Sequence, residues 1–594
     1  MLSRPRRASR LILSSLCSYM LIAVSQAYAT DYYVDNVNGH DASNGGVTQP
    51  WRSLTQSVKR LVAQDTLTLV DNGPSRPYRE AIIPKTSGVN GEVITISGAG
   101  PDARPFVIGS VNWSDRSAGG TMDWTTTDNE IFTLTDVPKP PSALWASHKI
   151  GWHFGGVKSL AQRDNAESDI IMPGMWQYSS ADQTLSYRLK AGEAIESLHI
   201  EAVVSPTLVN ISTRHYINVA DIQFMFSAGT AVGILKASTN ISLNNVDVKH
   251  AGKNAIVAEG GENISIENCV IDDAVNNGIV FKGSAENKLR NSVIRGCTVS
   301  RVHNNDCITL HKNSGLDDIG SGHLLENNVA SQCGEQGIDV TSGSDITLLS
   351  NTTYGNGDSG IVLGHGVTNI VVANHLSVDD GRYAGILVND AQDVSIANSC
   401  ILDSIKHQVA FKDAERVKFE GNIVYQGQAR QGSLIDIALN SSSIDFASNQ
   451  IVSESTSDTL LLRYLQDNNP VDTGVYFYAN SWSTPVENAK SFYTPNRGSS
   501  DLQDHNQHYG RNLSDAVSID VIFASLEQAI NTNKCNLDLI PEKHKRWDSN
   551  ASLLADSDAV SPRIETVSRP SRPESRPSRV VSSSGEVIEL PPGC

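Results

Sequence analysis

The sequence predicts an all-β protein whose fold is a right-handed parallel β-helix, a solenoid with an N-terminal capping helix and a β-rich insertion. Asn residues followed by apolar residues recur along the chain, most often at steps of 23 or 24 residues. A small residue followed by Ile recurs in step with them, and apolar residues alternate with period two in between. Two short strands per repeat cannot bury their apolar sides alone, but they can when successive coils stack about 4.8 Å apart.

The Asn residues mark one turn of each coil. They stand at Asn245, Asn268, Asn328, Asn351, Asn374, Asn398 and Asn422. Stacked Asn side chains satisfy backbone groups at a repeated turn, which is typical of a parallel β-helix. The spacing widens between Asn268 and Asn328 and so predicts longer loops there, and loops on one face of a stacked scaffold commonly hold binding residues.

Two other repeat architectures fit the sequence less well. A leucine-rich horseshoe has a similar period, but it requires several Leu per repeat, whereas Ile, Val and Asn dominate here. Helical repeats require apolar residues at a period of 3.6, and here they alternate with period two. The parallel β-helix therefore remains the predicted fold.

Residues 1–29 have the pattern of a secretory signal peptide. Four Arg residues precede the apolar run from Leu11 to Val24, and the small-residue site Ala27-Tyr28-Ala29 follows it. The apolar run is too short for a comfortable membrane span, so we expect no membrane anchor. The protein is therefore predicted to be secreted or periplasmic.

The remaining segments follow in order along the chain. Residues 30–109 are predicted to hold the first coils and a short helix capped by Ser53, with Gln56 three residues on, that plugs the open end of the solenoid. The periodicity is interrupted at 110–200, the predicted insertion beside the helix. It returns for the β-helix core at 201–480 and fades in a C-terminal cap region at 481–564. The Pro-, Ser- and Arg-rich end, 565–594, predicts a disordered tail.

The insertion contains aromatic residues with two possible roles. Trp145, Trp152 and Trp176 fit either a stacking surface for sugar rings or a small core of the insertion itself.

The charge balance restricts the partners. The full chain has a formal net charge of −18, which becomes more negative when the four arginines of the signal peptide leave. We expect no nucleic acid partner. An acidic polymer would have to bind through a local basic groove or a bridging cation such as calcium. A monomer is expected.

The eight cysteines do not suggest a disulfide framework in a chain of 594 residues. Cys269 and Cys297 occupy equivalent places in neighbouring coils, and we interpret them as stacked interior side chains and not as a bridge. No cysteine spacing is typical of zinc.

Three stretches carry a resemblance to a known superfamily. The opening "YYVDNVNGHDASNGG" with "PWRSLTQSV", the later "MWQYSSADQTLSYRLKAGEAIESLHIEA" and the Asn-rich coils resemble bacterial right-handed β-helix proteins of the pectate-lyase-like superfamily, over roughly residues 31–480. Its members include polysaccharide lyases, glycoside hydrolases and uronate epimerases. The resemblance implies a polysaccharide substrate but does not choose the reaction, since one scaffold hosts many chemistries.

Strand parity places candidate site residues on one outer surface. If Ile308 and Leu310 point inward, Thr309 and His311 point outward. Coil stacking then puts Lys282, His311 and Thr341 in one column and Thr309 with Asp339 in the next. Asp306 and His303 precede the same strand.

These residue types suit β-elimination from a uronate, which needs a base for the proton beside the carboxylate and a positive charge to stabilise the resulting anion. Lys282 or His311 is the predicted base, with Asp306 and Asp339 as calcium ligands or neutralising acids. In β-helix lyases, the resemblance implies a Lys or Arg base with calcium held by acids. Predicted substrate-binding residues are His303, Thr309, Lys312 and Arg382. Solvated polar residues on an exposed sheet are the plain alternative. Asp379 and Asp380 fit either a calcium-binding turn or a solvated turn, and we interpret them as a solvated turn.

A hydrolase is the second hypothesis. "NNDCITLHKNSG" followed by "CGEQGIDVTSG" resembles polygalacturonase motifs, but Asn305, Asn277 and Gln336 replace residues that the family carries as Asp, Asp and His. Inverting hydrolysis needs two carboxylates, and only Asp306 is retained unless Asp272 or Asp273 substitutes. A secreted polysaccharide lyase is therefore predicted first, a glycoside hydrolase second, and a non-catalytic glycan-binding or surface protein remains the third alternative.

Overall fold

The computed structural model gives the fold of most of the chain. The described residues are 29–114, 122–148, 158–162, 172–283, 287–312, 320–427, 430, 432–454, 460–465, 473–483, 492–494, 498–500, 535, 537–544, 579–581 and 587–589. The predicted signal peptide and most of the predicted tail lie outside these residues. No helix among the described residues is long and apolar enough to cross a membrane.

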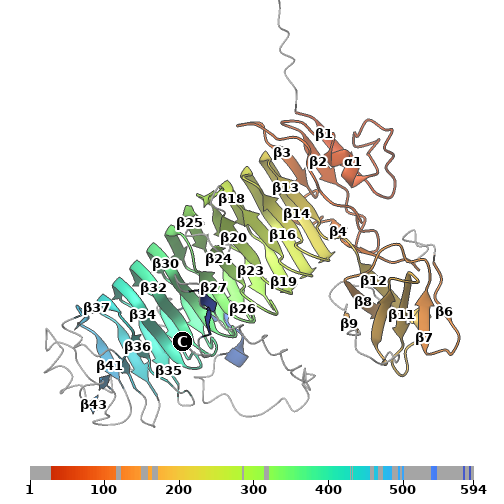
Figure 1. The fold of residues 1–594 in the computed structure, drawn as a ribbon. Coiled ribbons are helices and arrows are strands. Elements are labelled where there is room, and N and C mark those ends of the chain that lie inside the picture. The colour runs from red at the N-terminus through yellow and green to blue at the C-terminus, as the bar shows by residue number, and fades with distance from the viewer. Residues whose placement is uncertain are drawn as a thin grey trace, which may run out of the picture. The chain divides into compact units, whose positions relative to one another are not determined.

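Stacked coils of parallel strands form the main body, as Figure 1 shows. Each coil contributes to three strand ladders, here named A, B and C. Ladder A contains β13 (Val209–Ser212), β15 (Val232–Leu235), β17 (Ile256–Glu259), β20 (Ile279–Gly283), β24 (Ile308–Lys312), β27 (Gln336–Val340), β36 (Ile435–Ala438), β39 (Leu462–Leu465) and β42 (Phe492–Thr494). The predicted parallel β-helix is confirmed.

The two other ladders complete each coil. Ladder B contains β1 (Asp31–Val34), β2 (Thr66–Leu69), β3 (Ile94–Ser97), β18 (Gly261–Glu267), β21 (Leu289–Arg290), β22 (Val293–Arg295), β25 (Gly320–Glu326), β28 (Ser344–Leu349), β37 (Ser442–Ala447) and β40 (Tyr476–Tyr478). Ladder C contains β4 (Phe106–Ile108), β19 (Val270–Ala274), β23 (Thr298–Ser300), β26 (Val329–Ser331), β29 (Thr352–Tyr354), β31 (Leu376–Val378), β33 (Cys400–Leu402), β35 (Ile423–Gln426), β38 (Gln450–Ser453) and β41 (Ser481–Ser483). Five long strands span two ladders: β14 (His215–Ser227) and β16 (Thr239–Ala251) join B to C, and β30 (Ser359–Ala373), β32 (Ala384–Ala397) and β34 (His407–Glu420) join A to B.

Repeated apolar and Asn side chains hold the coils in register. Ile279, Ile308 and Ile338 are successive partners in ladder A, and all three are fully buried. The predicted Asn stack is present in part: Asn328, Asn351 and Asn422 are buried, whereas Asn268, Asn374 and Asn398 are exposed at the preceding turn position. The backbone N–H of Asn328 donates to Oδ1 of Asn351 at 3.0 Å, and both side chains are buried. Each buried Asn thus satisfies a backbone group that the turn would otherwise bury without a partner.

The predicted capping helix is α1 (Leu54–Val58). Ser53 caps it, because its hydroxyl accepts a hydrogen bond from the backbone N–H of Gln56 at 3.3 Å. Leu54 and Val58 are buried in the same core as the coils. The helix therefore extends the apolar interior at the N-terminal end of the solenoid.

The segment predicted as an insertion contains a separate eight-stranded sheet. Its order is β5 (Ser110–Val111), β12 (Leu198–Val203), β8 (Ala143–His148), β9 (Lys158–Gln162), β10 (Met175–Ser179), β11 (Thr184–Arg188), β7 (Ile131–Leu134) and β6 (Thr125–Thr126). All neighbouring pairs are antiparallel except β9 with β10. Trp176 is fully buried in this segment's own core, whereas Trp145 is partly buried against another cluster of apolar residues. Trp152 lies outside the described residues.

Three disulfides within the described part of the chain correct the prediction for the cysteines. Cys269 bonds to Cys297, Cys307 to Cys333 and Cys400 to Cys535. The stacked position of Cys269 and Cys297 was predicted, but the sequence spacing suits a bridge between coils as well as a simple stack. Disulfides of this kind are typical of proteins outside the cytoplasm.

The C-terminal part adds short elements. β43 (Gly498–Ser500) pairs antiparallel with β42. Two single-turn 3-10 helices, η4 (Leu537–Leu539) and η5 (Glu542–His544), follow Cys535, and a third, η3 (Ile195–Ser197), precedes β12. Residues 548–594 form a separate unit in which β44 (Arg579–Val581) and β45 (Val587–Glu589) pair antiparallel.

Candidate functional site

The structure brings four predicted site residues to neighbouring positions on ladder A. Lys282 pairs with His311 in the register of β20 and β24. Thr309 pairs with Asp339 in the register of β24 and β27. The predicted register of these strands is confirmed. Thr309 and Asp339 are therefore direct neighbours although they lie 30 positions apart in the sequence.

A line of hydrogen bonds joins three of these side chains. Oγ1 of Thr309 lies 3.1 Å from Oδ2 of Asp339 and 3.3 Å from Nδ1 of His311. Thr341 donates to the same Asp339 oxygen at 3.0 Å. Asp339 is therefore held by two hydroxyl groups, and Thr309 connects it to the imidazole.

Asp306 completes the group from the start of β24. Its Oδ1 accepts a hydrogen bond from the backbone N–H of Gln336 at 3.1 Å, and its own N–H donates to Oδ1 of Asn277 at 3.2 Å. The residue is only 8% exposed. We name Lys282, Asp306, Thr309, His311 and Asp339 the ladder A cluster.

Burial raises the pKa of both carboxyl groups of the cluster. Burial raises the pKa of Asp306 well above its ordinary value, and the negative charge of Asp339 raises it further. Burial also raises the pKa of Asp339, although the hydroxyls of Thr341 and Thr309 act in the opposite direction. A carboxyl group that is buried beside a second carboxylate commonly stays protonated near neutral pH.

The imidazole and the lysine have complementary positions. Burial lowers the pKa of His311, and the positive charge of Lys282 lowers it further. Nζ of Lys282 lies 3.0 Å from Oε2 of Glu259 on the preceding strand β17. His311 is therefore neutral near pH 7 and can accept a proton, while Lys282 supplies a fixed positive charge beside it. Glu259 was missed at the sequence level, although it occupies the position of Lys282 one coil earlier.

The cluster does not amount to a calcium site. Calcium takes six to eight oxygen ligands, and the described residues contain no group of three or more His, Cys, Asp or Glu placed to hold a metal ion. The oxygens Oδ1 of Asp306 and Oδ2 of Asp339 are already engaged by an N–H and by hydroxyls. The steps proposed below are assigned to the side chains of this cluster.

Of the other predicted substrate-binding residues, His303 and Arg382 contact other acids, and the side chain of Lys312 lies outside the described residues. His303 turns to Asp273 at the corner between ladders C and A. Arg382 is highly exposed and pairs with Asp358. Lys312 ends β24, but its side chain lies outside the described residues.

The predicted solvated turn at Asp379 and Asp380 is wrong. Asp379 is 5% exposed and Asp380 is fully buried. Nδ1 of His544 lies 2.8 Å from Asp379, and Arg430 pairs with the same carboxylate. Asp380 accepts hydrogen bonds from Thr353 and other interior donors. Asp379 thus holds His544 of the C-terminal segment, and Asp380 belongs to a group of interior polar side chains. The local composition of the turn could not reveal these distant partners.

Part of the chain matches a known family. Residues 230–377 and 294–451 match the family model described as "Right handed beta helix region". This part of the chain is therefore a right-handed β-helix region.

One curated relative is similar over a short stretch. Over 96 residues, or 14% of this chain, the sequence is 32% identical to the mannuronan C5-epimerase AlgE5 of Azotobacter vinelandii. The match covers 10% of that protein, so the chain spans about a tenth of the length of this relative.

Several solved structures are similar to this chain in backbone course. A mannuronic acid specific polysaccharide family 6 lyase from human gut microbiota has a TM-score of 0.48 at 12% identity, covering 83% of this chain and 95% of its own. XylC in complex with xylose has a TM-score of 0.47 at 13% identity, covering 72% and 76%. The A-module of the Azotobacter vinelandii mannuronan C-5 epimerase AlgE6 has a TM-score of 0.39 at 16% identity, covering 53% and 91%.

Proposed function

We propose that the chain is an extracytoplasmic enzyme that removes the C5 proton of a uronate residue in a polysaccharide and releases a cleaved chain by β-elimination. The observation that carries this proposal is the ladder A cluster, in which a neutral imidazole, a lysine and two protonation-prone carboxyl groups share one face. Proton abstraction beside a carboxylate needs these three kinds of group.

His311 is the proposed base. A neutral imidazole with its proton on Nδ1 donates to Thr309, and Thr309 in turn donates to Asp339, which matches the distances of 3.3 and 3.1 Å. This arrangement leaves the lone pair on Nε2 available to take the C5 proton. Thr309 and Asp339 thereby set the tautomer of the base.

The other groups manage the charge that develops. When the C5–H bond breaks, its electron pair moves into the uronate carboxylate, where the positive charge of Lys282 stabilises it. The pair then forms the C4–C5 double bond while the C4–O4 bond breaks. Asp306, whose pKa burial raises, donates a proton to the departing O4 oxygen.

Epimerisation at C5 is the second candidate function, and the 96-residue similarity to a mannuronan C5-epimerase favours it. The first step would be the same. In an epimerase, the carbanion takes a proton back from the opposite face, so O4 keeps its bond and the chain stays intact.

One assay separates these reactions from the alternatives. Purified protein is incubated with polymannuronate, polyguluronate, polygalacturonate and a glucuronate-containing polymer, and the absorbance near 235 nm is followed. We expect absorbance from the unsaturated ends with at least one polymer. New reducing ends without this absorbance would indicate a hydrolase. A changed C5 configuration by NMR, with neither absorbance nor new ends, would indicate an epimerase, and no change by any of these readouts despite binding would indicate a non-catalytic protein.

A further inference from the structure

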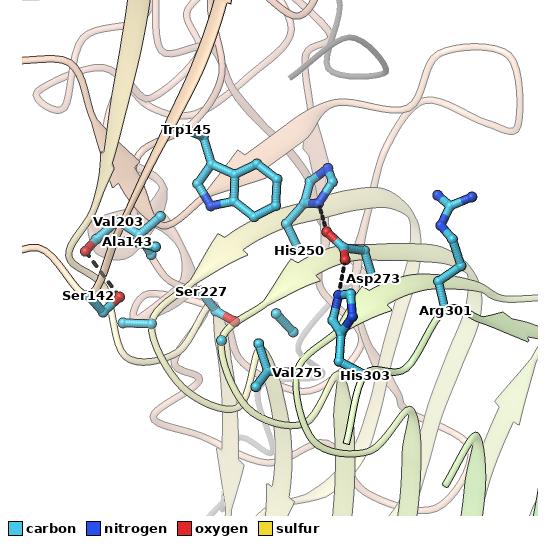
Figure 2. Close-up of a pocket in the computed structure, with 13 residues that line it drawn as sticks. Ser142, Ala143, Trp145, Val203, Ser227, His250, Asp273, Val275, Arg301 and His303 are labelled. Carbon is cyan, nitrogen blue, oxygen red and sulfur yellow. Dashed lines mark hydrogen bonds and ion pairs between the residues drawn. The ribbon is translucent and has the colours of Figure 1, made fainter. Parts of the chain in front are cut away.

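A second group of polar side chains lies at the corner between ladders C and A, next to the insertion (Figure 2). It lines a pocket of about 570 Å³, well within the size of ordinary small-molecule sites. We name it the corner pocket, and its defining residues are Trp145, Ser227, His250, Asp273, Arg301 and His303.

Asp273 lies at the centre of the polar side of the pocket. One of its oxygens contacts Nδ1 of His250 and the other contacts Nε2 of His303, as the dashed lines in Figure 2 show. Burial alone would raise the pKa of this carboxyl group, but the contacts with His250 and His303 hold it far below its usual range. Asp273 therefore stays ionised and fixes both rings.

Aromatic and small residues form the apolar side of the pocket. The ring of His250 lies 4.3 Å from that of Trp145 and 5.2 Å from that of Phe226, so its orientation is fixed from two directions. Ala228 and Ala251 also line the pocket. Together, these residues offer a flat apolar surface beside a hydrogen-bonding edge.

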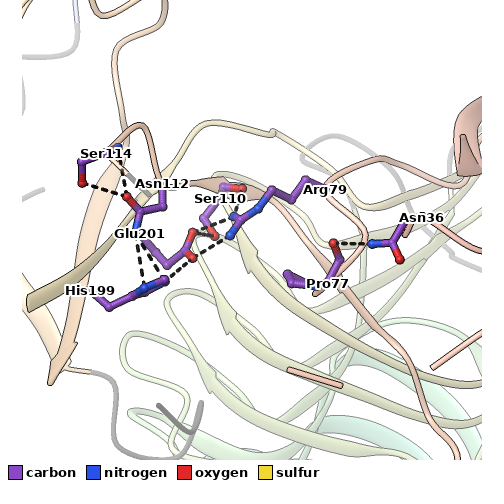
Figure 3. Close-up of polar contacts among 8 residues, drawn as sticks. All are labelled: Asn36, Pro77, Arg79, Ser110, Asn112, Ser114, His199 and Glu201. Atoms are coloured by element: carbon purple, nitrogen blue, oxygen red, sulfur yellow. Dashed lines mark hydrogen bonds and ion pairs between the residues drawn. The ribbon is translucent and has the colours of Figure 1, made fainter. Parts of the chain in front are cut away.

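The insertion side of the pocket is fixed by a buried ion pair. Arg79, from the first coils, makes two contacts of 2.8 and 2.9 Å with the carboxylate of Glu201 on β12, which also accepts from Ser110 at 2.7 Å (Figure 3). Burial would raise the pKa of Glu201, but the charge of Arg79 and the contacts with Arg79 and His199 lower it to about 2. β12 pairs directly with β8, which carries Trp145.

We propose that the corner pocket binds a neutral sugar residue. The cations at its rim already have partners, since Arg301 pairs with Asp272 and His303 pairs with Asp273. A ligand carboxylate would therefore be repelled by the negative charges of Asp272 and Asp273. A sugar hydroxyl carries no charge, and it both donates and accepts hydrogen bonds.

The two imidazoles present suitable positions for such hydroxyls. His250 uses Nδ1 and His303 uses Nε2 for Asp273, so Nε2 of His250 and Nδ1 of His303 are the ring nitrogens that remain for a ligand. The C–H face of a pyranose would pack on Trp145 and the alanines. This binding does not depend on the reaction proposed for the ladder A cluster.

Ligand binding by the purified full-length chain tests the proposal. The probes are the methyl glycosides of galactose, glucose, mannose and xylose, with methyl glucuronide as the acidic comparison. Their binding is measured by saturation-transfer NMR and by calorimetry. We expect at least one neutral glycoside to bind with a dissociation constant on the order of millimolar, because a monosaccharide has few atoms. His303→Ala and Asp273→Asn should each weaken this binding about tenfold or more.

Two control variants locate the binding. Asp339→Asn alters the ladder A cluster and should leave the affinity for the neutral glycoside unchanged, as should His365→Asn, which changes an exposed His on β30. The proposal is wrong if no neutral glycoside binds, if methyl glucuronide binds more tightly, or if His303→Ala leaves the affinity unchanged. Loss of binding in Asp339→Asn would also contradict it, by moving the ligand to ladder A. His303 is 57% exposed in its side chain, so His303→Ala should not disturb folding.

Discussion

Asp273 in the corner pocket and Asp339 in the ladder A cluster are two partly buried carboxyl groups two coils apart, yet their pKa values move in opposite directions. Burial raises both. Two imidazoles outweigh burial at Asp273, whereas the two hydroxyls at Asp339 do not. The partners, more than the depth of burial, therefore decide whether a carboxyl group serves as a fixed acceptor or as an acid.

The largest expected effect concerns the base of the ladder A cluster. His311→Asn should lower kcat/KM on the cleaved uronate polymer by about 10²- to 10⁴-fold, the usual contribution of a general base. The matched control is His365→Asn, since His365 is exposed and has a positive φ that Asn tolerates. Comparable losses in both variants would contradict the assignment of His311.

The disulfides allow the two sites to be separated. Cys307–Cys333 joins the coil of Asp306 to that of Asp339, and Cys269–Cys297 joins the coil of Asp273 to that of His303. Replacing Cys307 and Cys333 together by Ala should lower the free energy of unfolding by about 2–4 kcal/mol, as measured by urea denaturation.

Each bridge should affect its own site. We expect the Cys307/Cys333 variant to lose activity on the polymer while it keeps its affinity for the neutral glycoside. The Cys269/Cys297 variant should show the reverse. Equal loss of both functions in both variants would mean that the two sites are not independently braced.

A smaller effect is expected for the fixed acceptor. Asp273→Asn leaves one imidazole without its carboxylate oxygen, so it should lower the free energy of unfolding by about 1–3 kcal/mol at pH 7. The folded-state pKa of Asp273 lies below its unfolded value of 3.8, so its stabilising contribution is present above that pH and is lost as the pH falls further. Because Asp273 also raises the pKa of His303, the difference between wild type and variant should grow as the pH falls from 7 to 5 and shrink only below about pH 4.

The smallest effect has the opposite sign. Burial raises the pKa of Asp339 to about 6 from 3.8, so the stability that this group contributes is complete below about pH 4 and is lost as the pH rises through 6. Asp339→Asn removes the ionised form, and its amide oxygen can still accept from both threonines. We expect stabilisation by about 1–2 kcal/mol at pH 7, disappearing near pH 4, together with loss of activity. Destabilisation at pH 7 would show that the carboxylate is preferred there.

The register of ladder A could be predicted because the chain returns to the same face at a nearly constant period. Ile308 identifies the inward positions, and from it the outward positions of Thr309 and His311 follow. The same period placed Cys269 beside Cys297 but could not distinguish a stack from a bond, since both need the same spacing. The buried environment of Asp380 was missed because an Asp in a turn is usually solvated. The sequence does not show that Thr353, Asn356 and Ser377 donate hydrogen bonds to it.

Periodicity alone could have indicated only the polar side of the corner pocket. His250, Asp273 and His303 recur at coil spacing, and Asp273 was considered only as a replacement carboxylate for hydrolysis. Trp145 comes from the insertion, whose sheet has no repeat that would relate it to the coils. Its position depends on tertiary contacts such as the buried pair of Arg79 and Glu201.

Exchange of the C5 proton of the substrate tests the central claim most directly, because elimination and epimerisation both begin by removing it. The uronate polymer that responds in the absorbance assay, or polymannuronate if none responds, is incubated with the protein in D₂O, and NMR follows the C5–H signal. The wild type should remove this signal, by forming the double bond or by introducing deuterium at C5, and His311→Asn should do so at least about 100-fold more slowly. A polymer that is cleaved while its C5–H signal stays intact, or an unchanged rate in His311→Asn, would contradict the proposed role of the ladder A cluster.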